Sequence, residues 1–301
     1  MQIQRECLSF SLLPEKELDW SDKGVRGIYK FLVKLFSLVQ DNKSALTMES
    51  LSVGIFKAMK NMDKNLVSRT SRAIKKTTEF LEKNQHSLAI GAIMELANIL
   101  FKYAATENIS REAFSYAVKN IALLLSPFAP HLAEEIWHII GFKSFVSIEK
   151  WPEYSKELTD NEAEAAYDLI QQTRKDIIAV MGLIKIKSPK KITLFTADEW
   201  KYGFLKMLKK ELEKTRDTKE IISAVMSTDY KKYGKEAIKL AAKTASKSIG
   251  IVLDKGTEDK IIKENIASLE KEFNCPVVLG KGSENPKSKN ALPGKPAILI
   301  E

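Results

Sequence analysis

The chain has 301 residues, of which 44% are hydrophobic and 29% are charged, and its formal net charge at pH 7 is +9. This length suggests about two domains, and the composition is that of an ordinary globular protein. The two cysteines, Cys7 and Cys275, lie far apart, which argues against a disulfide framework and against a zinc site. No run of about 18 apolar residues predicts a membrane span, and the polar start is unlike a signal peptide. A cytoplasmic protein is expected, with a surface suited to an anionic partner or to lysine-rich ion pairs.

Hydrophobic residues at helical spacing predict six helices in the first half of the chain. Ser21 or Asp22 is suited to cap the first of them, which would run to about residue 41. Short polar connections between the helices indicate an antiparallel bundle. The other five helices are expected at 49–61, 64–83, 87–105, 110–125 and 131–140.

The second half changes character after an extended stretch that includes Trp151 and Pro152. Runs of β-branched and aromatic residues predict strands at 191–196, 276–279 and 297–300. Between the last two lies a basic loop, 280–290, whose glycines do not have the spacing of a phosphate-binding P-loop. Helices are expected near 160–183, 198–214, 217–227, 229–247 and 258–273.

The predicted fold class is therefore mainly α: an antiparallel helical bundle followed by a small α/β domain. The bundle is expected to occupy 19–144, a linker 145–159, and the α/β domain 160–301. Residues 1–18 are expected to connect the bundle to whatever precedes it.

A proline corner lies between the fifth and sixth predicted helices. Proline lacks the N–H group that a helix interior requires, but it is well placed in a first turn. Pro127 and Pro130 therefore force a tight corner between an apolar helix end and a new helix. His131, directly after Pro130, is interpreted as a capping or packing residue of this corner.

Several segments resemble one enzyme family. Leu123–Trp137 resembles the corner of the anticodon-binding helical domain of class I aminoacyl-tRNA synthetases. Pro14–Asp22 and His86–Asn98 resemble the segment after the catalytic core and the mid-bundle helix of leucyl-tRNA synthetases. Asp198–Lys201 and Leu292–Glu301 resemble the C-terminal domain of the archaeal and eukaryotic type. The resemblance spans almost the whole chain and implies a bundle of the class I anticodon-binding type.

The signatures of amino-acid activation are missing from this sequence. The family uses a His-x-Gly-His tetrad and a Lys-Met-Ser-Lys-Ser loop, and neither is present. The resemblance therefore implies a C-terminal part of a leucine–tRNA ligase, either an excised piece or one subunit of a split enzyme. No catalytic residue and no metal site are expected here. ATP and Mg²⁺ would serve the full enzyme, and the expected partners are tRNA(Leu) and the catalytic and editing part.

Two helices carry basic stripes that contain no acidic residue. At about 100° per residue, the cations of the first helix fall within an arc of about 80° and those of the 64–83 helix within about 60°. Such stripes are interpreted as rails for the phosphate backbone of the tRNA body, and the alternative is a lysine-rich solvent face. The candidate residues are Lys23, Arg26, Lys30, Lys34, Arg69, Arg72, Lys76 and Lys83.

The resemblance implies a second RNA contact at the end of the chain. In the archaeal type, the small C-terminal domain contacts the tip of the long variable arm of tRNA(Leu). A carboxylate and main-chain groups can read the edges of exposed RNA bases. The alternative is that 297–300 is only an edge strand that closes the sheet. The candidate residues are Lys185, Lys187, Lys295, Pro296, Ile300 and Glu301.

Other functions remain open at this point. His131 and His138 lack further ligands and are weak evidence for metal. The four tryptophans are interpreted as core or corner residues rather than base-stacking platforms. A stand-alone RNA-binding accessory protein derived from a synthetase and a structural helical scaffold with solvated basic faces are the two alternatives. A valine or isoleucine enzyme is a lesser one, because Leu292–Glu301 favours leucine.

Overall fold

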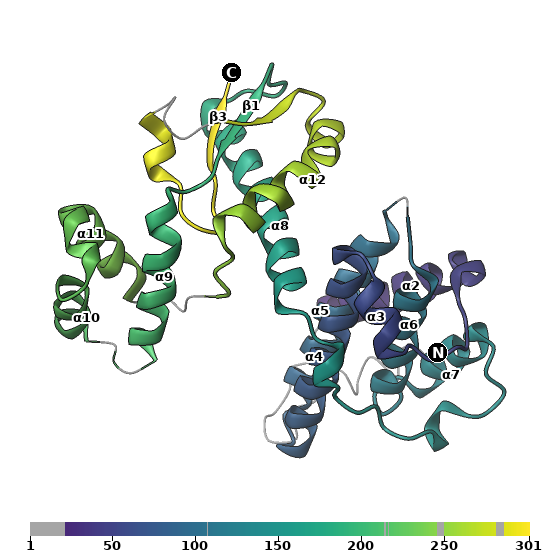
Figure 1. Cartoon of the computed structure of the whole chain (residues 1–301). Helices are drawn as coiled ribbons and strands as arrows, with labels where there is room; N and C mark the ends of the chain where they lie inside the picture. The colour runs from purple at the N-terminus through teal and green to yellow at the C-terminus, as the bar shows by residue number, and fades with distance from the viewer. Residues whose placement is uncertain (1–21, 107, 214, 216, 246–249, 281–285) are drawn as a thin grey trace. The chain divides into compact units, whose positions relative to one another are not determined.

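The computed structural model describes residues 22–106, 108–213, 215, 217–245, 250–280 and 286–301. The expected connection at 1–18, the Ser21 cap, Trp20 and part of the 280–290 loop lie outside the described residues. The chain divides into two compact units, 1–164 and 165–301, and each is described by itself (Figure 1).

The first unit is a helical bundle, which confirms the fold class expected for this half. The shortest helix, expected at 49–61, covers only Val53–Ala58, because Ser52 caps it by accepting a hydrogen bond from the Ile55 N–H at 3.3 Å. The α-helices of the first unit are α2 (Asp22–Asp41), α3 (Val53–Ala58), α4 (Asn61–Glu82), α5 (His86–Ala104), α6 (Arg111–Leu125) and α7 (Pro130–Ile140). The first unit also contains three short 3-10 helices: η1 (Lys43–Ala45) lies between α2 and α3, and η2 (Val146–Ile148) and η3 (Lys156–Leu158) come after α7.

Helix α5 supplies much of the core of this unit. Ile90, Ile93, Leu96 and Leu100 are each 5% exposed or less, and they pack with apolar residues of α4, α6 and α7. By length and composition alone, α5 is apolar enough to cross a membrane. Its burial within the bundle accounts for that composition.

The proline corner forms as expected. Helix α6 ends at Leu125 and Pro130 occupies the first turn of α7, which ends at Gly141 with a left-handed φ of 116°. Trp137 is 1% exposed and stacks on Phe142 with ring centroids 4.1 Å apart. Trp137 is therefore a core residue, as interpreted from the sequence.

The second unit contains a small sheet beside helices, which confirms the expected α/β domain. Strand β1 lies in the centre, parallel to β2 and antiparallel to β3, with Ile192 opposite Val277 on one side and Ile300 on the other. The strands are β1 (Ile192–Phe195), β2 (Val277–Leu279) and β3 (Ala297–Ile300). The helices are α8 (Asn161–Ile184), which begins in the first unit, α9 (Glu199–Leu212), α10 (Thr218–Met226), α11 (Gly234–Ala245) and α12 (Lys255–Phe273).

Two larger apolar cores support the described part of this unit. One lies between the sheet, α8 and α12, and the other lies among α9, α10 and α11. The helix expected at 229–247 is divided into a 3-10 turn, η4 (Asp229–Tyr233), and α11, because Gly234 takes a left-handed φ of 49°. η4 and α11 share one hydrophobic periodicity, which predicted a single helix. The turn at Gly234 requires a positive φ, and it separates the two elements.

Candidate nucleic-acid interface

The basic stripe of α2 is exposed where its side chains are described. Arg26, Lys30 and Lys34 are exposed, and Leu32 and Leu35 on the other side are buried in the bundle. The Lys34 ammonium lies 4.1 Å from the centroid of the Phe101 ring, a favourable cation–π contact. The side chain of Lys23 lies outside the described residues. This stripe offers three described cations to an anionic ligand.

The stripe of α4 separates into two parts. Lys76 and Lys83 are exposed, and the Lys76 ammonium lies 3.8 Å from the exposed carboxylate of Glu95. Arg69 and Arg72 instead turn toward the carboxylate of Glu164, at 3.7 and 2.6 Å from their Nε atoms. The sequence suggested a stripe without acids, because Glu164 lies about ninety residues away on another helix.

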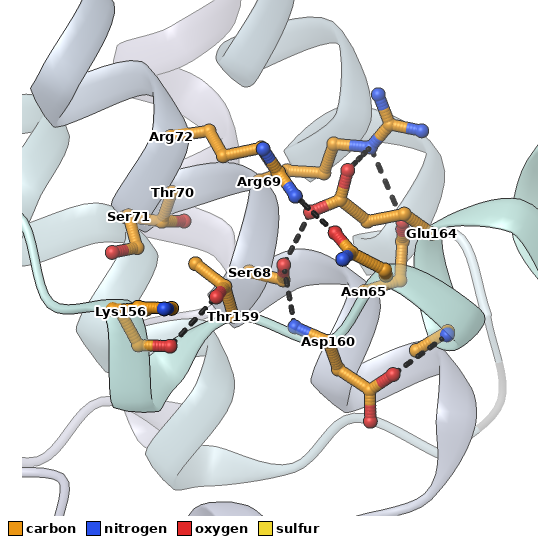
Figure 2. Close-up of polar contacts among 12 residues, drawn as sticks. Asn65, Ser68, Arg69, Thr70, Ser71, Arg72, Lys156, Thr159, Asp160 and Glu164 are labelled. Atoms are coloured by element: carbon orange, nitrogen blue, oxygen red, sulfur yellow. Dashed lines mark hydrogen bonds and ion pairs between the residues drawn. The ribbon is translucent and has the colours of Figure 1, made fainter. Parts of the chain in front are cut away.

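Glu164 is the centre of a polar cluster between α4 and the first turn of α8 (Figure 2). Its side chain is 8% exposed. The Ser68 hydroxyl donates to Glu164 and accepts a hydrogen bond from the Asp160 N–H at 2.9 Å. Arg72 also donates to the side chain of Asn161. A buried carboxylate needs such partners, and here it finds a hydroxyl and two guanidinium groups.

Asp160, the residue before α8, belongs to the same cluster. Its carboxylate accepts hydrogen bonds from the N–H groups of Glu162 and Ala163 at 3.1 and 2.9 Å, which is the arrangement of an N-cap. The other oxygen of Asp160 lies 3.6 Å from the Lys64 ammonium. Helix α8 is therefore capped by a residue that is itself held to α4.

Of the residues expected to form a linker, 145–159, those from Trp151 onward contact α4. The Trp151 indole N–H donates to the Thr78 hydroxyl at 2.8 Å. The Ser71 hydroxyl donates to the main-chain oxygen of Ser155 at 2.8 Å and accepts from its N–H at 3.2 Å. This segment is thus tied to the first unit by hydrogen bonds. We call the contacts that join α4 to 151–164 the α4 clamp.

Periodicity of apolar residues did not reveal the α4 clamp. A usable signal was the polar row on the inward side of α4, where Ser68 and Ser71 are buried and Thr78 is half-buried at helical spacing. Buried polar side chains require hydrogen-bond partners, so such a row indicates a neighbouring irregular segment. The sequence could not identify which segment that is.

The predicted arm-contacting residues fall into two groups. Lys185 and Lys187 are exposed between α8 and β1, and Lys185 has a left-handed φ of 57°. Lys295 is exposed and its ammonium lies 3.6 Å from the Asp176 carboxylate. The remaining three residues belong to the last strand and its approach.

Those three residues are mainly structural where the structure describes them. Pro296 is buried and Ile300 packs against the core beside the sheet, so neither presents a full side chain to a ligand. The main-chain oxygen of Glu301 accepts hydrogen bonds from Lys190 and Lys191 at 2.7 and 3.3 Å. The exposed side chain of Glu301 is thereby held at the edge of the sheet.

A second buried carboxylate, Glu258, lies in the first turn of α12. Its Oε2 accepts a hydrogen bond from the Gly294 N–H at 2.9 Å, and the Tyr202 hydroxyl and Asp259 lie beside it. Burial raises the pKa of Glu258 to about 7, and the neighbouring Asp259 charge acts in the same direction. Within the described ranges, no three histidine, cysteine or carboxylate side chains are grouped to hold a metal ion.

Comparison with known proteins shows what part of the chain resembles. Residues 63–196 match the family described as "Anticodon-binding domain of tRNA ligase". This part of the chain is therefore similar to the anticodon-binding domain of tRNA ligases. The matched residues include nearly all of α4, the proline corner and the whole α4 clamp.

Curated relatives extend the likeness beyond the anticodon-binding domain. A leucine–tRNA ligase of Pyrococcus abyssi is 30% identical over 295 residues, which are 95% of this chain and 29% of that protein. One of Methanococcus maripaludis is 34% identical over 272 residues, 90% of this chain and 27% of that protein. The chain thus spans little more than a quarter of the length of these archaeal relatives.

One solved structure also matches part of this chain. It is a LeuRS of Agrobacterium radiobacter K84 in a ternary complex with tRNA and LeuAMS, 25% identical, with a TM-score of 0.47. The match covers 52% of this chain and 20% of that one.

The α4 clamp predicts strong coupling between Glu164 and Arg72. In a double-mutant cycle of Glu164→Gln and Arg72→Met, we expect a coupling energy of about 1 kcal/mol or more in the free energy of unfolding, measured with urea. The matched control is Lys75–Glu79 on the same helix, which lies 3.8 Å apart and is about half exposed at both ends. That pair should couple by only about 0.3–0.5 kcal/mol. Equal coupling in both pairs would contradict the clamp.

The buried Glu258 predicts a pH dependence of stability. Its pKa of about 7 in the folded chain exceeds the ordinary value of 4.5, so between these values the folded chain holds a proton that the unfolded chain has released. The free energy of unfolding should therefore fall as pH rises from about 4.5 to 7, by a few kcal/mol at most, since one pKa unit corresponds to about 1.4 kcal/mol.

The variant Glu258→Gln isolates this contribution, because an amide oxygen still accepts the hydrogen bond from Gly294 but does not titrate. Urea unfolding at several pH values should show a smaller fall for the variant than for the unchanged chain. An identical fall in both proteins would exclude Glu258 as its source.

Proposed function

We propose that this chain is the tRNA-binding part of a leucine–tRNA ligase. It positions tRNA(Leu) through its body and its long variable arm for aminoacylation by a catalytic and editing part. The observation that carries the proposal is a basic, exposed stripe on a chain that is similar to leucine–tRNA ligases over nearly its whole length. Holding a reactant in the required orientation can contribute much of a rate enhancement without any chemical step.

The tRNA body is assigned to the exposed cations of the first unit. Each cation that neutralises a phosphate releases condensed counterions, which gives affinity without base reading. Arg69 and Arg72 are assigned to the α4 clamp, since both already face the buried carboxylate of Glu164. Lys23 stays a candidate by its position on α2. The described cations proposed to contact phosphates are Arg26, Lys30, Lys34, Lys76 and Lys83.

The variable arm is assigned to the second unit. Lys185, Lys187 and Lys295 are exposed and supply positive charge, and the Glu301 carboxylate supplies an acceptor for the edge of a base. Pro296 and Ile300 support this contact by holding the last strand in place. Because β3 pairs with the central strand, Ile300 and Glu301 are held at the edge of the sheet.

The chemical step is assigned to the catalytic part, with its ATP and Mg²⁺, and none of its residues is placed in this chain. The site of action is proposed to be the cytoplasm. A stand-alone accessory RNA-binding protein would bind structured RNA without a synthetase core, and a scaffold would bind RNA weakly with a steep salt dependence. Binding experiments distinguish these alternatives.

The body contacts predict a change in salt dependence. Lys30→Ala and Lys76→Ala remove one exposed cation from each stripe, and each should lower the slope of log K against log salt by about one for tRNA(Leu). Lys150→Ala is the matched control, because Lys150 is exposed but lies outside both stripes. Fluorescence titration across a salt series gives the slopes. An unchanged slope in both stripe variants would show that the stripes are only solvated.

The arm contacts predict a loss that depends on the tRNA. Lys185→Ala combined with Lys187→Ala should weaken binding of tRNA(Leu) several-fold, while a tRNA(Leu) with a shortened variable arm should bind the variant and the unchanged chain alike. This substitution is preferable to deleting the chain end, because deletion would also remove Ile300 from the core. Equal losses for both tRNAs would refute the assignment of the arm to this unit.

A further inference from the structure

The irregular segment before the last strand is held by two buried ionisable side chains. It comprises η6 (Pro286–Asn290) and the turn that leads into β3. Lys201 of α9 and Glu258 of α12 both bind its main chain, and they are 1% and 0% exposed. A segment of this length that contains no α-helix and does not pair with the sheet needs such partners for its main-chain groups.

Lys201 makes the more demanding contact. Its ammonium donates to the main-chain oxygens of Lys289 and Ala291 at 2.6 and 3.3 Å. It also lies 3.1 Å from the Glu236 carboxylate and 3.9 Å from that of Asp198. An ammonium has three N–H donors, so two carbonyls and Glu236 account for all of them. A buried lysine is costly without such complete pairing, so this cation has a specific structural task.

The turn after η6 is held from the other side. Gly294 has a left-handed φ of 76° and donates its N–H to Glu258. The main chains of Leu292 and Lys295 pair across this turn, with N–O distances of 3.0 and 2.8 Å. Lys289, Ala291 and Gly294 are therefore three fixed main-chain points within six residues.

The side chains of η6 divide into an inner and an outer set. Ser288 and Ala291 are buried, and Ala291 packs with Ala197 and Tyr202. Lys287 and Lys289 are exposed on either side of the buried Ser288. The inner contacts thus fix the backbone that carries two exposed lysines.

We propose that η6 is a phosphate-binding turn for RNA, in which Lys287 and Lys289 contact the backbone and Lys201 is a positioning residue that acts through the turn. This inference rests on the proposed function, because it names a further contact of the second unit with tRNA. A preorganised turn binds more tightly than a loose one, since less conformational entropy is lost on binding. The buried ammonium supplies that preorganisation by fixing the carbonyls on both sides of Asn290.

The experiment compares four forms of the full chain for binding of tRNA(Leu) across a salt series. The combined variant Lys287→Ala and Lys289→Ala should weaken binding on the order of tenfold and lower the salt slope by about two. Lys201→Met should weaken binding in the same direction. Lys206→Met is the matched control: it removes a lysine from the same helix, one whose ammonium contacts the exposed carboxylate of Asp254 at 2.5 Å. It should change the affinity less than twofold.

A double-mutant cycle separates positioning from general stability. Lys201→Met should cost much less affinity when Lys287 and Lys289 are already alanine, although its effect on the unfolding midpoint should be the same in both backgrounds. Full additivity in affinity would overturn the positioning role. Unchanged affinity of the variant lacking Lys287 and Lys289 would overturn the phosphate-binding turn.

A second variant covers the case in which Lys201→Met fails to fold. Glu236→Gln weakens the ion pair from its half-exposed end and should reduce affinity in the same direction by a smaller factor. If it binds as tightly as the unchanged chain, the positioning role is again overturned. Failure of the proposed function has a different signature, because then the unchanged chain itself would not bind tRNA(Leu).

Discussion

The contact between the buried Glu164 carboxylate and α4 decides how the first unit ends and how α8 begins. Glu164 lies in the first turn of α8. It accepts a hydrogen bond from Ser68 of α4 and forms ion pairs with Arg69 and Arg72 of the same helix. Together with the hydrogen bonds of Trp151 and Ser155, it attaches the segment after the bundle to the bundle itself. A segment that the sequence predicted as a linker is therefore part of the folded first unit.

The same contact changes which cations can serve RNA. A guanidinium that faces a buried carboxylate gives up that partner before it can bind phosphate, and the exchange leaves a buried charge uncompensated. The exposed lysines pay no such penalty. On α4 the positive charge therefore divides between two arginines that contact a buried carboxylate and exposed lysines that we propose contact the ligand.

Buried ionisable side chains play a related part in the second unit. Lys201 and Glu258 hold main-chain groups of an irregular segment, whereas Glu164 holds side chains of a neighbouring helix. In each case a charged group satisfies polar groups that no helix or strand pairing reaches. These are the places where a single substitution should alter function at a distance from any ligand.

The sequence predicted most helices and all three strands of the described residues, because apolar periodicity and β-branched runs report burial directly. The predicted helix boundaries were wrong in two places. The helix expected at 229–247 is interrupted by Gly234, and α3 is shorter than expected. The roles of Glu164 and Lys201 could not be predicted, since a charged residue gives no sign of its burial until a partner about ninety residues away is known. The exposed stripe of α2 follows from spacing alone, because both its faces lie on one helix.

We propose above all that two separate surfaces of this chain bind one tRNA, the first at its body and the second at its variable arm. Backbone footprinting of tRNA(Leu) with the chain bound tests this most directly, because it reports protected phosphates individually. We expect two protected regions, one in the body and one in the variable arm. A single region, or weak protection spread evenly along the RNA, would contradict it.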